Sequence, residues 1–404
     1  MRSKSAIILW VIIVLMVVTG IGFLVASKQD VVVPAGATVK QAEEFEDFYR
    51  DKVPQKYDMW QHSAHGENGV TCINCHGEEN LSDEELEYGN FNVVTPEKCG
   101  ECHEHEYKGW QDTRHVEAVE YSQKNVRYKL LDGYHAMQQQ GCNSCHDKVG
   151  NTCTSCHQGH TTALPKPEQM AAPHETVTNN FTNGCENCHM GPDHPQREAY
   201  QSSVHYQVAQ ATGQPTCVIC HTDPDNRHKI IQLKGENEEE GRKKLRENCL
   251  NCHTKQYVDN AMATVDSIKK ETNRIVDEAR KIIQGLYADG IMEPNPGSLL
   301  DENGIPMLNA KGTSYSHVSH IENLMFELFK YAGATTIKGA QHFAPDYTHW
   351  HGNADLWNKY LAIKEEAERL RMEAKVREKL EIEKEEYPMF KYTNETGQEL
   401  NDLK

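Results

Sequence analysis

The stretch "GCNSCHDKVGNTCTSCHQGH", residues 141–160, holds two Cys-x-x-Cys-His units with six residues between them. One such unit is typical of covalent c-type haem attachment. Its two thiols form thioether bonds with the two vinyl groups of one porphyrin, and the histidine that follows ligates the iron. Two units this close in sequence predict two haems nearly in contact.

The same unit accounts for all 14 cysteines of the chain. Each of the seven units therefore predicts one c-type haem, held by two cysteines and a proximal histidine. The units are Cys72/Cys75/His76, Cys99/Cys102/His103, Cys142/Cys145/His146, Cys153/Cys156/His157, Cys185/Cys188/His189, Cys217/Cys220/His221 and Cys249/Cys252/His253. A zinc ribbon does not need a histidine after each pair, a thioredoxin-like redox pair would occur once, and disulfides would not impose the histidine.

The N-terminus predicts export and a membrane anchor. Haem attachment of this kind takes place outside the cytoplasm, and Arg2 and Lys4 precede 21 uncharged residues, 6–26, long enough to span a bilayer as a helix. We expect an uncleaved single-pass anchor at the cell membrane, with the haem-binding part on the periplasmic or extracytoplasmic side. The alternative is a cleaved signal peptide, which usually has a shorter apolar region.

Composition narrows the partners and the fold. The net charge of −18 argues against nucleic acid, which needs a basic surface. The hydrophobic content of 38% is low for a chain with a large core, but porphyrins are themselves apolar core material. We therefore expect a mainly α fold, a multihaem cytochrome c with a loop-rich haem-binding region and a C-terminal region of long helices. The predicted domains are the anchor 1–26, the seven-haem domain 27–255 and the helical region 256–404.

Helical spacing of apolar residues predicts helices over 257–286 and 316–332, with a loop over 295–312. Residues 354–384 predict one long charged helix. Its rough apolar stripe consists of Leu356, Leu361, Leu370, Val376 and Leu380. A long helix with a narrow stripe usually packs on partner helices, which predicts a homo-oligomer. The alternative is a solvated helix lying on its own subunit.

A repeated pattern predicts distal haem ligands. Residues 60–65, 110–115 and 200–205 all read aromatic-Gln-x-Ser/Thr-x-His beside a haem unit. Three copies indicate one repeated role, so we expect His65, His115 and His205 to be distal ligands, with the aromatic ring against a porphyrin face.

Two further histidines follow proximal ones closely. His160 and His228 are expected to be distal ligands, His160 of the haem at His157. The histidines that compete for a sixth distal position are His62, His105 and His135. Six bis-histidine haems would leave one iron open, and an open iron is where small molecules bind and react.

The chain resembles the hydroxylamine oxidoreductase family of multihaem cytochromes from about Trp60 to Tyr360. Residues 141–160 resemble the family's closely spaced central haems, the first being catalytic. "CENCHMGPDHPQREAYQSSVH", residues 185–205, resembles the next haem followed by an Asp-His pair. "CVICH" and "CLNCH" resemble the last two haems, and "GAQHFAPDYTHWHGNADLW", residues 339–357, resembles the segment that reaches the active site.

The resemblance implies an active site and a direction. Asp193 and His194 would lie over the open iron at His146 and relay protons, supplemented by His349 or His351 of the C-terminal segment. The family usually carries eight haems, and the first is missing here. Members whose catalytic haem is linked to a tyrosine oxidise hydroxylamine; this chain has no clear match to that tyrosine, since Tyr347 aligns beside its position. The resemblance therefore favours a reductive member that converts nitrite or hydroxylamine to ammonium.

Two alternatives stay open at this point: hydroxylamine oxidation, and a pure electron conduit in which all seven irons are six-coordinate. The expected partners are the membrane, a quinol-linked or small-cytochrome electron donor or acceptor, a small nitrogen-oxide substrate, and further copies of the chain, a trimer by the resemblance.

Overall fold

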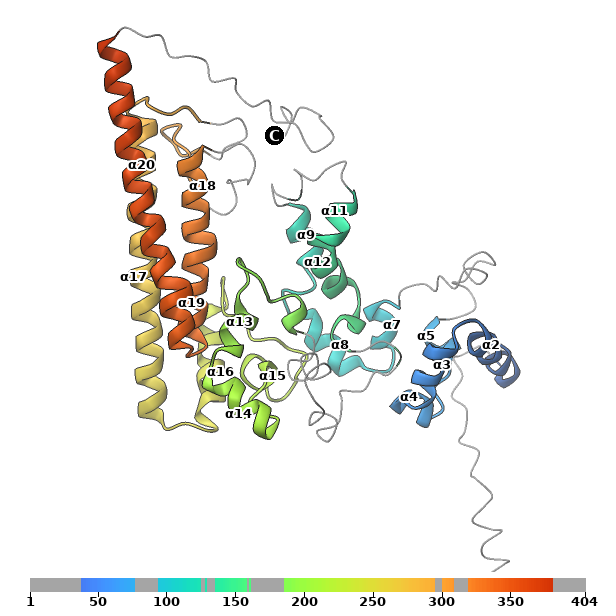
Figure 1. Cartoon of the computed structure of the whole chain (residues 1–404). Coiled ribbons are helices and arrows are strands. Elements are labelled where there is room, and N and C mark those ends of the chain that lie inside the picture. The colour runs from blue at the N-terminus through green and yellow to red at the C-terminus, as the bar shows by residue number, and fades with distance from the viewer. Residues whose placement is uncertain are drawn as a thin grey trace, which may run out of the picture. The chain divides into compact units, whose positions relative to one another are not determined.

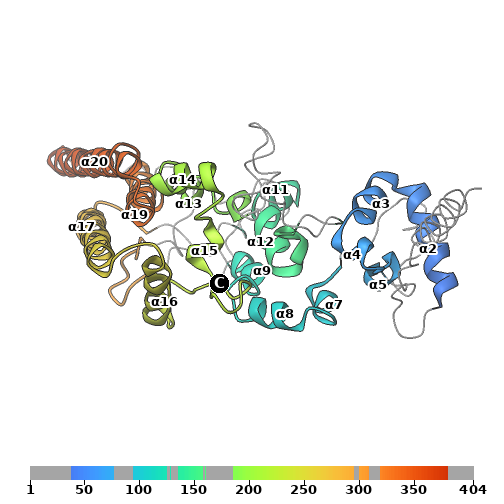
Figure 2. The ribbon, with the colours of Figure 1, turned by 90° about the horizontal axis from the view of Figure 1, so that it is seen from below.

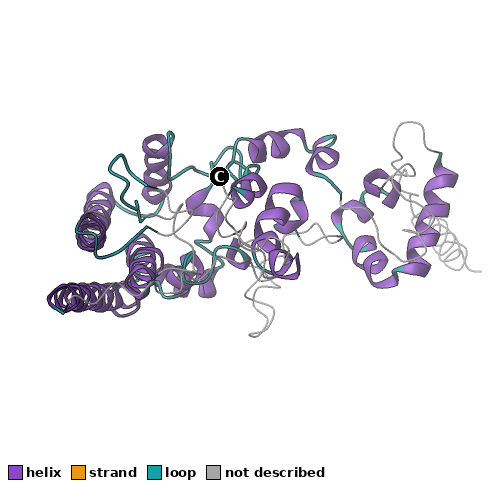
Figure 3. Ribbon diagram, turned by 90° about the horizontal axis from the view of Figure 1, so that it is seen from above, coloured by secondary structure: helices purple, strands orange, loops and turns teal. Residues whose placement is uncertain are grey.

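The computed structural model describes residues 38–76, 94–124, 128, 135–157, 160, 185–294, 300–308 and 319–380. These residues are mainly helical (Figure 3), which confirms the predicted fold class. Within them, extended pairing is limited to isolated bridges, Thr222–Ile230 and Leu300–Pro306. The chain forms two compact units, Met1–Val94 with Gln158–Ala163, and Thr95–His157 with Leu164–Lys404. The domain limits drawn from the sequence stay predictions.

The first unit is a small group of helices around one haem-binding unit. Its helices are α2 (Val39–Lys52), α3 (Pro54–Gln61), α4 (Ala64–Glu67) and α5 (Cys72–His76). Helix α2 packs against α3 and α5. On it, buried Tyr49 lies over the ring of His76, with the ring centroids 5.4 Å apart. Helix packing thus places one wall of the His76 site.

The second unit begins with short helices, most of which carry or flank a haem-binding unit. They are α7 (Pro96–Gly100), α8 (Glu104–Gln111), α9 (Ala118–Gln123), α11 (His135–Gln140), α12 (Cys142–Asn151), η2 (Cys153–Ser155), η5 (Cys185–Asn187), α13 (Gln196–Gln201), α14 (Val204–Thr212), α15 (Cys217–His221) and α16 (Glu238–Leu250). Short helices joined by tight turns expose many backbone groups, so caps and side-chain hydrogen bonds must hold them in place.

Three long helical rods complete the second unit (Figures 1 and 2). The first is α17 (Lys255–Ala288), which begins directly after the last haem-binding unit, where the Thr254 hydroxyl accepts a hydrogen bond from the amide of Tyr257. The second runs through α18 (His320–Phe326), the π-helical η6 (Glu327–Ala332) and α19 (Gly333–Gln341). The third runs through the π-helical η7 (Tyr347–Asn353) into α20 (Ala354–Lys379). These bounds agree closely with the helices predicted over 257–286, 316–332 and 354–384.

The apolar core of this unit lies between the three rods. Its fully buried side chains include Ile283 on α17, Leu328 on η6 and Ile363 on α20. Burying such a side chain stabilises a fold by about 1.5–3 kcal/mol, so this bundle is the rigid part against which the haem-binding helices are built.

Rods two and three meet at a tight turn and approach each other closely there. A side chain at Gly339 would place its Cβ 2.9 Å from the backbone nitrogen of Thr348, and one at Gly352 would lie 2.6 Å from the Cα of Thr336. Glycine at both positions lets α19 and η7 pack backbone against backbone. The turn that joins them contains His342 and is closed by Phe343, which takes a positive φ of 57°.

The apolar stripe predicted on residues 354–384 divides between two environments. Leu356 is fully buried in the core, and Leu370 packs against it. Leu361, Val376 and Leu380 are exposed. One side of the stripe therefore packs on its own subunit, as the alternative held, while the oligomer contact stays a prediction for the other side.

The predicted localisation has to be corrected. Searching the part of the chain that the structure describes finds no helix that is both long enough and apolar enough to cross a bilayer. The single-pass anchor at the cell membrane is therefore not supported. The segment assigned to it, 6–26, lies outside the described residues.

Candidate haem-binding and active site

Five of the seven proximal histidines face a second imidazole ring. The pairs and their centroid separations are His76–His160 at 6.0 Å, His189–His115 at 6.2 Å, His157–His228 at 5.7 Å, His253–His205 at 5.9 Å and His221–His342 at 6.1 Å. Two imidazole nitrogens that ligate one metal ion, each at about 2 Å, would hold their ring centroids roughly 6 Å apart. The observed spacing therefore fits an iron bound between the rings of each pair.

The protonation of these rings suits metal binding as well. Desolvation by burial lowers the pKa of His76, His189 and His342 to about 4 and that of His221 to about 3. The rings therefore stay neutral at ordinary pH, which is the form that binds a metal. In the pair at His157, the two Nε2 atoms lie 3.5 Å apart and face each other.

The repeated aromatic-Gln-x-Ser/Thr-x-His pattern forms one local structure three times. In each copy the amide of the hydroxyl residue donates to the carbonyl of the aromatic residue over 2.9 Å, in the pairs Ser63–Trp60, Thr113–Trp110 and Ser203–Tyr200. The hydroxyl residues are all buried. The resulting turn ends one helix and presents the histidine two residues later.

In two copies the hydroxyl also caps the next helix, since Ser63 accepts from the amide of Gly66 and Ser203 from that of Tyr206. A polar side chain that satisfies the first amides of a helix fixes where that helix begins. Of the three predicted histidines, His115 and His205 face proximal rings, and His65, on α4, stays a predicted distal ligand.

The structure places His160 beside His76 rather than beside His157, where the sequence analysis put it. His157 is faced by His228 instead. The reason is that His160 belongs to the first compact unit, although the residues just before it belong to the second. A short separation in sequence was therefore a poor guide to the partner of each ring.

His342 is the distal histidine that the sequence analysis missed. It faces His221 from the turn between α19 and η7, and its Nδ1–H donates to the carbonyl of Lys338 over 2.8 Å. That hydrogen bond leaves Nε2 for a metal. The sequence signal was present, since the quoted stretch 339–357 contains His342, but only the turn geometry separates it from His349 and His351.

The three histidines proposed for the sixth distal position hydrogen-bond elsewhere. Nδ1 of His62 donates to the carbonyl of Asp58 over 2.8 Å, and Nε2 of His105 donates to that of Asp225 over 3.3 Å. Nδ1 of His135 lies 3.2 Å from Oε1 of Gln138. No ring contact of any of them with a proximal histidine occurs within the described ranges.

His146 differs from the five paired histidines. Its Nδ1–H donates to the carbonyl of Ala118 over 3.1 Å, which orients the ring. Across the residues that the structure describes, no second imidazole faces this ring. The neighbours of the His146 unit include His194: the pKa of the Cys145 thiol is lowered chiefly by its hydrogen bond with Cys188, and further by Ser144, His146 and His194.

Asp193 and His194 form a hydrogen-bonded pair near this unit. Nδ1–H of His194 donates to Oδ1 of Asp193 over 2.9 Å, and Oδ2 of Asp193 lies 3.7 Å from Nζ of Lys330 on η6. Their loop is fixed by Glu198, whose Oε1 accepts from the amide of Gly191 over 2.9 Å. A carboxylate that holds Nδ1 leaves Nε2 of the imidazole able to give or take a proton.

His349 and His351 lie on η7 and are exposed. His351 stacks on Tyr347 at 5.3 Å, and His349 packs edge-on against Trp350 at 4.6 Å. The rings that they contact belong to their own segment, so a role at an active site stays a prediction that involves another subunit.

Contacts between cysteines show which haem-binding units are neighbours. Side-chain hydrogen bonds join Cys99 to Cys153, Cys145 to Cys188 and Cys185 to Cys217. The His146 unit therefore touches the His189 unit, and the His157 unit touches the His103 unit. The sequence analysis expected the His146 and His157 units to be immediate partners, but α12 continues to Asn151 and separates them by nearly two helical turns.

The second cysteine of three units differs from these linked thiols. Cys102 and Cys252 are exposed, and Cys75 is only partly buried. The structure therefore does not enclose these three predicted haem-binding residues as it encloses the paired histidines. The physical reason is that each lies at the end of a short helix or turn, where a thioether-bonded porphyrin would itself be the cover. Haem attachment at Cys75, Cys102 and Cys252 stays a prediction that rests on the sequence unit.

Apolar side chains left exposed near these units complete the test of fit. Val204 and Val208 flank His205, Tyr257 stacks on His253 at 4.8 Å, and Met190 follows His189; all four are exposed. Exposed apolar groups gathered beside proximal and distal histidines suit the faces of a porphyrin, which is large and apolar. The cysteines, the paired histidines and these walls all fit c-type haem.

A family model described as "Seven times multi-haem cytochrome CxxCH" matches residues 68–297, more than half of the chain. The chain belongs to this family. It is a multihaem c-type cytochrome, which confirms the predicted class of cofactor.

Solved structures share the fold. A reducing HAO-like protein complex of Kuenenia stuttgartiensis matches with a TM-score of 0.66 at 20% identity, covering 84% of this chain and 87% of that one. A hypothetical multiheme protein matches with a TM-score of 0.63 at 14% identity, covering 87% of this chain and 98% of that one. The comparison with curated proteins returns no match.

Proposed function

We propose that this cytochrome is an oxidoreductase that reduces nitrite or hydroxylamine to ammonium at the haem bound by Cys142, Cys145 and His146. The observation that carries the proposal is the asymmetry between His146 and the five paired histidines. Those five face a second imidazole that would close the coordination of an iron. His146 instead has the Asp193–His194 pair in its neighbourhood. The name of the Kuenenia stuttgartiensis structure, a reducing HAO-like complex, supports the same direction.

Haem bound at these sites would supply the electrons, and one iron with an open position would hold the substrate. The protein itself must supply protons, because reducing nitrite to ammonium consumes six electrons and eight protons. A positioned imidazole with a free Nε2 can deliver protons one at a time. Asp193 keeps Nδ1 of His194 protonated, and Lys330 balances the charge of the carboxylate.

The neighbouring units give this site an electron supply. The Cys145–Cys188 contact joins it to the His189 unit, and the Cys185–Cys217 contact continues to the His221 unit. We propose a small cytochrome as the electron donor and further copies of the chain as oligomer partners.

The test is the oxidation of a reduced viologen dye by the haem-loaded protein in the presence of nitrite or hydroxylamine. Turnover with ammonium as the product supports the proposal. Hydroxylamine oxidation without nitrite reduction would reverse the direction. Absence of turnover in either direction, with all irons six-coordinate, would leave an electron conduit.

A further inference from the structure

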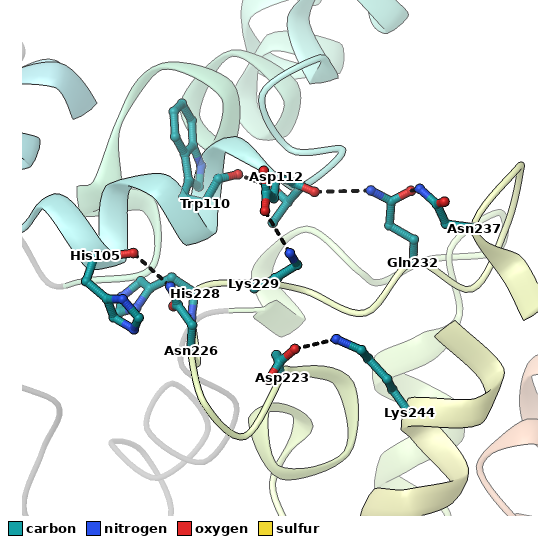
Figure 4. Close-up of polar contacts among 11 residues, drawn as sticks. His105, Trp110, Asp112, Asp223, Asn226, His228, Lys229, Gln232, Asn237 and Lys244 are labelled. Carbon is teal, nitrogen blue, oxygen red and sulfur yellow. Dashed lines mark hydrogen bonds and ion pairs between the residues drawn. The ribbon is translucent and has the colours of Figure 1, made fainter. Parts of the chain in front are cut away.

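The loop that carries His228 is fastened to helix α8 and the turn after it (Figure 4). Nζ of Lys229 lies 2.7 Å from Oδ2 of Asp112, and Nε2 of Gln232 donates to the carbonyl of Asp112 over 3.1 Å. At its start, Oδ2 of Asp223 pairs with Nζ of Lys244 on α16 over 2.5 Å. The loop is thus held at both ends, with His228 between the two fastenings.

Asn226 makes the connection closest to His228. Its Nδ2–H donates to the carbonyl of His105 over 2.7 Å, and its Oδ1 accepts from the backbone amide of His228 over 3.0 Å. One amide side chain is needed for both bonds, because it combines a donor and an acceptor. Figure 4 shows it between the two histidines. Asn226 therefore ties the backbone of His228 to a residue that lies two positions after proximal His103.

Helix α8 makes room for this side chain. A Cβ at Gly109 would lie 2.6 Å from Cγ of Asn226, so even an alanine there would displace it. The glycine and the asparagine fit each other, and a change at either one disturbs the same contact.

We infer that Asn226 is a positioning residue for the haem held by His157 and His228. It fixes the backbone from which His228 projects, and the two rings lie within 18° of parallel. Hydrogen bonds to the residues around a metal ligand set its orientation and the strength of its bond. Because the same side chain holds the segment after His103, and Cys99 contacts Cys153, it also keeps two neighbouring haem-binding units in register. The inference rests on one part of the proposed function, that His228 is an axial ligand.

The experiment compares the haem-loaded protein with its Asn226→Ala and Asn226→Asp variants. Cyanide is added to the oxidised protein, and its displacement of an axial histidine is followed in the visible spectrum and by electron paramagnetic resonance. Losing such a support typically weakens a metal site about 10–100-fold. We therefore expect one low-spin haem of Asn226→Ala to bind cyanide about 10–100-fold more tightly than in the wild type. Asn226→Asp keeps the acceptor for His228 but loses the donor, so its effect should be smaller and in the same direction.

Asn237→Ala is the matched control. The Asn237 side chain donates to Oε1 of Gln232 over 3.2 Å, on the same loop but away from His228, and should leave cyanide binding unchanged. Gly109→Ala should reproduce the effect of Asn226→Ala if the latter folds poorly. His228→Ala tests the underlying assignment and should convert one low-spin haem to high spin.

These outcomes separate the two claims. If His228→Ala creates a high-spin haem but the Asn226 and Gly109 variants bind cyanide like the wild type, the positioning role is wrong and the ligand assignment stands. If His228→Ala leaves every haem low-spin, the assignment of His228 itself is wrong.

Discussion

His221 and His342 face each other with ring centroids 6.1 Å apart, although one lies in a haem-binding unit and the other in the turn between two long helical rods. The pair ties the C-terminal bundle to the haem-binding helices. Because Nδ1–H of His342 is held by the carbonyl of Lys338, the bundle also sets the orientation of the ring. We read the bundle as part of the haem-binding machinery.

Replacing His342 with alanine should convert one low-spin haem to high spin, because the ring that faces His221 is lost. All haems should stay attached, since the thioether bonds do not involve His342. The spectrum of the reduced protein with and without carbon monoxide measures this. His351→Ala, on the exposed side of η7, is the control. An unchanged spectrum for His342→Ala would show that the His221 haem has another distal ligand.

Replacing His194 with alanine should cut nitrite or hydroxylamine turnover by about 10²–10⁴-fold, the usual contribution of a general acid or base. The number of low-spin haems should not change, because the His194 ring is held by Asp193 and faces no proximal histidine ring in the described part of the chain. Steady-state assays and the visible spectrum of the same preparation decide this together. A new high-spin haem at near-normal turnover would mean that His194 is a ligand.

Lys330→Met should lower turnover modestly, by about 2–5-fold, because a partly exposed ion pair contributes up to about 1 kcal/mol. The lysine only balances the charge of Asp193 and touches no reacting atom. Lys330→Arg should restore most of the rate. Equal rates for the wild type and Lys330→Met would remove Lys330 from the relay.

The haem-binding units and the long helices could be predicted from the sequence because both are local. A Cys-x-x-Cys-His unit needs five adjacent residues, and the helix over 255–288 follows from periodic apolar side chains. The partners of the rings are set by long-range packing instead. His342 reaches His221 only because Gly339 and Gly352 let two rods close on each other, and no local pattern records that contact.

Gly339→Ala should destabilise the protein by about 1–3 kcal/mol, the usual cost of overpacking, because the new Cβ would lie 2.9 Å from the backbone of Thr348. Gly285→Ala is the matched control on α17. Its nearest neighbour would be Nη2 of Arg371 at 3.4 Å, and alanine stabilises a helix interior by about 0.5–1 kcal/mol relative to glycine. Thermal unfolding should therefore shift in opposite directions for the two variants. A shift in the same direction would contradict the close approach of α19 and η7.

The central claim is that one iron, at His146, is open while the others carry two axial histidines. Titrating the reduced, fully haem-loaded protein with carbon monoxide tests it most directly. The account predicts that one haem of the seven binds carbon monoxide, and that Ser or Ala in place of Cys142 and Cys145 abolishes this binding. Binding by none of the haems, or binding that survives the loss of the His146 haem, would contradict it.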